Sequence, residues 1–145
     1  MIGEASIAWL HFLGAFALAG AIGAELALYR REMTATAQRL LKNVDLGYGL
    51  SALVVLLTGL ARVFWFGKGA LYYSQNGFFW ALIALFALVS LLSLPPTLRY
   101  LRWQAKEPLV VDEERFRRLR TYLVLEAALF PLLPFCAVMM ARGIG

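Results

Sequence analysis

The stretch FFWALIALFALVSLLSLPPTL, residues 78–98, contains no charged side chain. A hydrocarbon core of about 30 Å takes about 20 apolar helical residues to cross, so this stretch predicts a transmembrane helix. Three further apolar stretches of similar length lie at residues 5–29, 46–66 and 121–141. The sequence therefore predicts an all-α integral membrane protein, a four-helix bundle that forms a single transmembrane domain over residues 1–145.

The bulk composition supports a membrane location. Hydrophobic residues make up 61% of the chain and charged residues 16%, against about 45–50% and about 25% in soluble domains. A soluble domain of about 150 residues buries only about 70% of the surface that its unfolded chain exposes. These values argue against a soluble enzyme, a secreted domain and a disordered chain. The single cysteine, Cys136, permits no disulfide within the chain.

Basic residues are distributed unevenly along the chain. Eleven of the fourteen lysines and arginines lie in two connectors, residues 30–45 and 99–120. Cytoplasmic loops carry the excess of Lys and Arg, so we expect both connectors in the cytoplasm, with both termini and a short outer loop, residues 67–77, outside. The sequence thus predicts a multi-pass protein of the inner (cytoplasmic) membrane, N-out/C-out. The net charge of the chain is +5. We expect its basic side chains to contact anionic lipid headgroups, and we expect no nucleic-acid partner.

Small residues in the first helix predict close helix packing. Ala15, Ala19 and Gly23 follow one another at four-residue spacing, with Gly20 beside them. Such stripes let two helix backbones approach closely in a bilayer. The stripe also fits a homodimer formed through this helix.

Prolines and one acidic residue predict helix ends. Pro131 and Pro134 remove backbone donors and are expected to kink the fourth helix. Pro95 and Pro96 are expected to mark the inner end of the third helix. Asp112 is a candidate N-cap for a cytoplasmic helix in the second connector.

An outer layer of polar residues is the first candidate site. His11 and Arg62 are expected at similar depth inside the membrane, next to Lys68 and Tyr72 of the outer loop. In one interpretation His11 is the metal ligand of a haem b, Arg62 and Lys68 pair with its propionates, and Tyr72 completes the cofactor site. In the other, Arg62 extends to the interface and His11 makes an interhelical hydrogen bond.

An inner layer of polar residues is the second candidate site. Glu25, Asp45 and Glu126 are expected within the helices, on the cytoplasmic side of the middle. Arg99, like the arginines of the first connector, is close enough in depth to pair with them. Two interpretations stay open, a structural cluster of ion pairs and a proton path through a buried glutamic acid.

Two helix faces connect the layers. His11, Leu18 and Glu25 fall on one face of the first helix, and Asp45 and Arg62 fall on one face of the second. We predict that both faces point to the bundle interior.

Several strings carry a family resemblance. They are Leu10-His11, ELAL at 25–28, RVF at 62–64, KGALYY at 68–73, Asn76 and PPTLRYLRW at 95–103. With these strings the chain resembles domain-of-unknown-function family 2214 of small bacterial predicted membrane proteins, over nearly its whole length. That family is more distantly similar to copper resistance protein D and to HemJ-type protoporphyrinogen oxidase. The resemblance implies a four-helix core and a haem or tetrapyrrole connection through His11.

The sequence leaves three functions open. The first is a redox protein that binds a b-type haem through His11. The second is a non-catalytic accessory or structural subunit, and the third is a small transporter or proton carrier that uses Glu25 and Glu126. No nucleophile triad, phosphate loop, CxxC or HExxH motif occurs. The catalytic residues, if any, are therefore unknown, and so is whether the protein is an enzyme.

Overall fold

A computed structural model describes residues 2–145 and shows the predicted four-helix architecture. Each of the four long helices is long and apolar enough to cross a membrane. The second is α2 continued by a π-helical turn, η1, and the fourth is formed by α5 and α6 together. In chain order the elements are α1 (Ile2–Leu28), β1 (Glu32–Met33), α2 (Ala35–Ala61), η1 (Arg62–Phe66), α3 (Ala70–Ser74), α4 (Gly77–Arg102), β2 (Leu109–Val110), α5 (Glu113–Leu129) and α6 (Leu132–Ala141).

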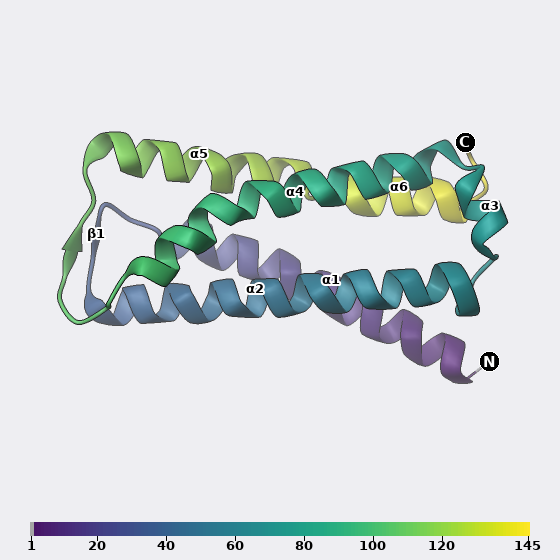
Figure 1. The fold of residues 1–145 in the computed structure, drawn as a ribbon, viewed down its shortest axis with the longest axis horizontal. Helices are drawn as coiled ribbons and strands as arrows, with labels where there is room; N and C mark the ends of the chain where they lie inside the picture. The colour runs from purple at the N-terminus through teal and green to yellow at the C-terminus, as the bar shows by residue number, and fades with distance from the viewer. Residues whose placement is uncertain (1) are drawn as a thin grey trace.

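The bundle is elongated, and its two ends differ (Figure 1). One end, called the connector end here, carries both basic connectors, which pair as the antiparallel strands β1 and β2. The other end, called the terminal end, carries both termini and α3. Helix α1 packs mainly on α2, and α4 packs on α5 and α6, while the N-terminal half of α1 crosses α2 and points away from α4 and α6 (Figure 1). The arrangement agrees with the predicted placing of both connectors on one side of the membrane.

Two predicted helix boundaries were wrong at the connector end. Helix α4 continues through Pro95 and Pro96 to Arg102. Tyr100, in the last turn, is fully buried, and an aromatic side chain that buries about 150–250 Å² favours the helical turn that places it there. Helix α2 begins at Ala35, well before residue 46, because Thr34 caps it by accepting a hydrogen bond from the Ala37 N–H.

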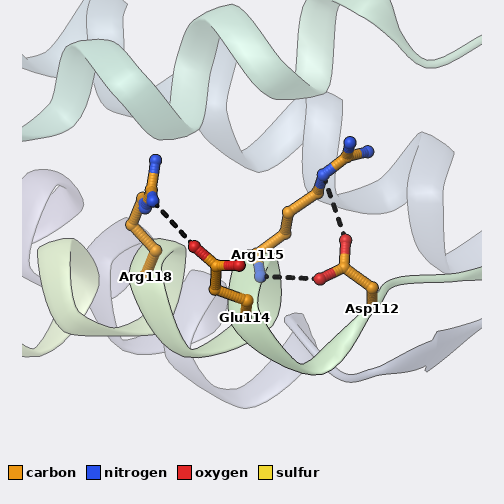
Figure 2. A network of polar contacts seen from close by, with 4 residues as sticks. All are labelled: Asp112, Glu114, Arg115 and Arg118. Carbon is orange, nitrogen blue, oxygen red and sulfur yellow. Dashed lines mark hydrogen bonds and ion pairs between the residues drawn. The ribbon is translucent and has the colours of Figure 1, made fainter.

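The fourth long helix begins in the second basic connector and is interrupted between Leu129 and Leu132. Asp112 caps α5, as predicted, by accepting a hydrogen bond of 3.1 Å from the Arg115 N–H. Its carboxylate also pairs with the Arg115 side chain, and Glu114 pairs with Arg118 one turn later (Figure 2). Within residues 2–145 the second connector holds no helix separate from α5, because α5 runs without interruption from Glu113 to Leu129. The predicted kink is confirmed at Pro131, between α5 and α6.

Two apolar clusters lie along the bundle axis. The connector-end cluster joins α1, α2, α4 and α5 with both connectors, and the smaller central cluster lies in α1 and α2. In the first, the Tyr29 ring stacks on Phe116 at 5.3 Å between centroids, and burial raises the pKa of Tyr29 to about 12. The connector-end cluster is Tyr29, Met33, Leu41, Tyr100, Val111, Leu119 and Leu123, and the central cluster is Leu18, Ile22 and Tyr48.

The close approach of α1 to α2 lies at Gly14 and not on the predicted stripe. A Cβ at Gly14 would lie 3.1 Å from methyl groups of both Val54 and Val55. A Cβ at Gly20 or Gly23 would meet no atom within 4 Å. The crossing of α1 and α2 is therefore set by Gly14 and the two valines, and the described residues leave open space beside Gly20 and Gly23.

Candidate functional site

Both predicted faces point to the bundle interior. On α1, Leu18 and Glu25 are buried and His11 is half-buried. On α2, Asp45 is buried and Arg62, in η1, is half-buried. The polar residues on these two faces are therefore buried or half-buried among the helices.

The inner layer is a cluster of three buried carboxyl groups from three helices. Glu25 of α1 is 4% exposed, Asp45 of α2 is 8% exposed and Glu126 of α5 is 2% exposed. The Glu25 carboxyl is within electrostatic range of the other two. Three acidic side chains thus meet in the interior of a membrane bundle, where each charge is costly.

Each carboxyl group faces a hydroxyl group of another helix. The Thr97 hydroxyl donates to Oδ1 of Asp45 at 2.6 Å. The Tyr48 hydroxyl lies next to the Glu126 carboxyl, and the Tyr100 hydroxyl lies next to Glu25. We call these six residues the carboxyl site: Glu25, Asp45, Tyr48, Thr97, Tyr100 and Glu126.

Two polar atoms of the carboxyl site are buried without a partner. They are Oε1 of Glu126 and the hydroxyl oxygen of Tyr100, and neither has a hydrogen-bond partner among residues 2–145. Tyr100 is 0% exposed. Unpartnered buried polar atoms are rare in folded proteins and indicate a functional group or an additional water or ion.

The arginines expected to pair with these acids lie elsewhere. Arg31 pairs with Glu113 at 2.8 Å, at the start of α5, and Arg99 lies near Tyr29. Within the part of the chain that the structure describes, no ion pair includes Glu25, Asp45 or Glu126. The carboxyl site therefore has hydroxyl partners in place of the expected basic ones.

In the outer layer His11 makes a contact between α1 and α2. Its Nδ1 lies 2.9 Å from the Thr58 hydroxyl, which itself donates to the Val54 carbonyl at 2.6 Å. Its ring packs over Gly59, where a Cβ would lie 3.5 Å from Cε1 of the imidazole. Gly59 thus leaves the space that the ring fills.

The other outer residues divide between two places. Arg62 lines an open groove with Glu4, Ala5, Ala8 and Phe66, between α1 and η1. Lys68 and Tyr72 instead hold the outer loop against the C-terminal end of α6. Nζ of Lys68 donates to the Ala141 carbonyl at 3.0 Å and the Tyr72 hydroxyl donates to the Met140 carbonyl at 3.1 Å.

The outer residues are not gathered around His11 within one chain. The His11 ring lies in the interface of α1 and α2, outside the groove at Arg62. Lys68 is bonded to the end of α6. Within residues 2–145, no group of three or more His, Cys, Asp or Glu side chains is placed to hold a metal ion.

Three hydroxyl residues of the carboxyl site were not predicted as site residues. Tyr48 lies one turn after Asp45 on the second helix, Thr97 directly follows Pro95 and Pro96, and Tyr100 lies beyond residue 98, the predicted end of the third helix. The spacing of Ser93, Thr97 and Tyr100 places all three on one face of a continuous helix. This pattern can be recognised only if the helix is known to continue through Pro95 and Pro96, as α4 does.

Comparison with known proteins identifies a family. Residues 3–145 match the model of the family described as predicted membrane protein (DUF2214). No curated protein and no solved structure matches the chain. The match covers the four membrane helices and every residue of both candidate sites, so the chain belongs to the DUF2214 family of predicted membrane proteins.

Proposed function

We propose that this membrane protein binds a proton at Glu126 and works as a small proton carrier. The observation that carries this proposal is the Glu126 carboxyl group, which is buried with Oε1 unpartnered. Glu25 and Asp45 lie close by, and among residues 2–145 no basic side chain pairs with any of the three. Three carboxylates without a cation would repel one another strongly, so the site favours bound protons.

The surroundings of the site support a carrier more than an open channel. The connector-end cluster covers the site on one side, and the central cluster lies on the other. A proton on Glu126 therefore needs a conformational change to leave, as expected of alternating access. The helix break at Pro131 lies about one turn after Glu126. It provides a hinge at which α6 can change its angle to α5.

We also propose the membrane and the orientation. The basic connector end faces the cytoplasm of a bacterial cell, because lysines and arginines accumulate on that side of inner-membrane proteins. Exposed basic side chains at this end, such as Arg102 and Arg117, contact anionic headgroups. A proton carried by Glu126 would then cross between the outside and the cytoplasm.

The test is proton movement in liposomes. The purified protein is reconstituted with a pH-sensitive dye inside, and a pH step is applied outside. We expect faster equilibration than in empty liposomes, lost in Glu126→Gln and retained in Glu126→Asp. Glu107→Gln, an exposed change in the second connector, is the matched control. Equal rates in protein-containing and empty liposomes contradict the proposal, as does a Glu126→Gln variant as fast as the wild type.

A further inference from the structure

We propose that the groove between the start of α1 and η1 binds the headgroup of a phospholipid that carries a primary amine, as phosphatidylethanolamine does. The phosphate pairs with the Arg62 guanidinium, and the ammonium group pairs with the Glu4 carboxylate. The groove shares no lining residue with the carboxyl site, so this inference is independent of the proposed function.

The groove is large enough for a headgroup. Its volume is about 400 Å³, and small-molecule sites in proteins usually hold about 300 to 1,000 Å³. It continues toward Trp65, because a second hollow beside that residue is also lined by Glu4 and Phe66. The groove is open, so the acyl chains of a bound lipid stay outside it. Its lining residues come from α1 and η1 and are Glu4, Ala5, Ala8, Arg62 and Phe66.

Arg62 and Glu4 bring opposite charges to one groove without pairing. Arg62 is half-buried and Glu4 is exposed. Among residues 2–145 no ion pair includes either side chain. A guanidinium binds a phosphate through two parallel hydrogen bonds, and an ionised carboxylate accepts hydrogen bonds from an ammonium group. A ligand that carries both a phosphate and an amine therefore complements both charges.

The backbone at Arg62 is shaped by a π-helical turn. Helix α2 gives way to η1 at this residue, and π-helical turns are rare and frequently occur at functional sites. Gly67 follows the turn, where a Cβ would collide with the Arg62 carbonyl oxygen and the Tyr73 hydroxyl. Gly3 of α1 packs on the same turn, because a Cβ there would lie 3.4 Å from the Phe66 ring. The glycines thus allow η1 to lie close to the start of α1.

Both charges lie where a lipid headgroup lies. One candidate membrane span begins at Ile2 and another ends at Phe66, so Glu4 and Arg62 each lie within about one helical turn of a span end. Trp65, beside the groove, is 76% exposed, and tryptophan accumulates at the membrane–water interface. A lipid in this groove keeps its acyl chains in the bilayer, which favours a lipid over a soluble ligand of the same charge.

Glu4 is expected to select the amine headgroup. The choline headgroup carries methyl groups in place of N–H donors, and the glycerol headgroup carries no positive charge. Neither donates a charge-assisted hydrogen bond to a carboxylate. We expect phosphatidylethanolamine to bind about tenfold more tightly than phosphatidylcholine or phosphatidylglycerol, as the loss of one such bond implies.

The experiment is native mass spectrometry of the purified full-length protein in detergent, mixed with equal amounts of the three lipids with identical acyl chains. We expect phosphatidylethanolamine to be the main bound lipid. Arg62→Gln weakens the binding of all three lipids about tenfold, because they share the phosphate. Glu4→Gln removes only the preference for the amine, and Ala5→Leu fills the groove and weakens all binding. Arg142→Gln, an exposed change at the terminal end, is the matched control and leaves binding unchanged.

Several results would overturn the lipid site. They are equal binding of the three lipids to the wild type, an unchanged preference in Glu4→Gln, and wild-type binding in Arg62→Gln. If Arg62→Gln does not fold, Glu4→Gln decides, because Glu4 is exposed in the first turn of α1. Glycerophosphoethanolamine, which has the same headgroup and no acyl chains, is the soluble probe. Full displacement of the lipid by an equal concentration of this probe would reject a lipid as the occupant.

Discussion

Thr97 of α4 donates a hydrogen bond of 2.6 Å to Asp45 of α2. The two residues are separated by a whole transmembrane hairpin in the sequence, and the bond joins helices that otherwise share little contact area. It supplies a donor to a buried carboxyl group that has no basic partner among the described residues. The hydrogen bond between Thr97 and Asp45 thus helps to fix α4 relative to α2 at the carboxyl site.

Removing the Thr97 hydroxyl is expected to destabilise the bundle. Thr97→Val keeps the shape and leaves Asp45 without a donor, which costs about 1–3 kcal/mol for a buried polar group. Thr97→Ser should restore most of the loss. Denaturant unfolding in detergent measures the difference. Thr121→Val, at an exposed position of α5, is the control, and an equal effect of both valine variants would show that the Thr97 bond contributes nothing specific.

His11 is expected to contribute to stability through Thr58. His11→Ala removes the bond of 2.9 Å between α1 and α2 and should cost about 1 kcal/mol. Thr58→Val should cost a similar amount, and the double variant should cost less than the sum. Additive losses would mean that the two side chains do not interact.

The absorption spectrum of the same variants tests the haem hypothesis. Because the His11 ring is held in the α1–α2 interface by Thr58 and packs over Gly59, we expect no Soret band that depends on His11. A Soret band in protein from haem-replete cells, lost in His11→Ala, would contradict this account. It would also point to a cofactor shared between two copies of the chain.

Two glycines of α1 provide a matched pair of substitutions. Gly14→Leu should destabilise the protein by at least about 1–3 kcal/mol, because a Cβ there already lies 3.1 Å from Val54 and Val55. Gly20→Leu should be neutral or stabilising in the monomer, since nothing lies within 4 Å. Unfolding and light scattering are measured on both variants. A loss of association in Gly20→Leu alone would support the predicted homodimer through this helix.

Because of Tyr29, the free energy of unfolding is expected to fall at alkaline pH. Burial raises its pKa to about 12, from about 10 for an exposed tyrosine. The stabilisation that depends on the neutral hydroxyl is therefore complete below a pH of about 10 and is lost as the pH rises through about 12. Tyr29→Phe should flatten this part of the curve of unfolding free energy against pH. An unchanged curve would mean that Tyr29 does not titrate with unfolding.

Much of the fold could be predicted from the sequence because bilayer thickness and charge bias act on whole segments. The four spans, the common side of both connectors and the Pro131 break all follow from such signals. The continuation of α4 through Pro95 and Pro96 does not, because it depends on the burial of Tyr100 by residues of α1 and α5. Local propensity therefore failed where tertiary packing decided.

The residues of the candidate site also divide into those that the sequence indicates and those that only tertiary packing brings together. Glu25, Asp45 and Glu126 were recognisable because charges within a span are costly. Their partners were not, since pairing depends on how far each side chain reaches across the bundle. Arg31 lies close in sequence to Glu25 but reaches Glu113, while Thr97 and two tyrosines supply the hydroxyl groups. Lys68 and Tyr72 were expected beside His11 and instead hold the end of α6.

The central claim is that Glu126 holds a proton within the membrane bundle, and infrared spectroscopy tests it most directly. The carboxylic acid C=O band of the purified protein is recorded at neutral pH, for the wild type, Glu126→Gln and the control Glu107→Gln. We predict a protonated-carboxyl band in the wild type and in Glu107→Gln that is reduced in Glu126→Gln. A wild-type spectrum without this band, or a band of full intensity in Glu126→Gln, would contradict the account.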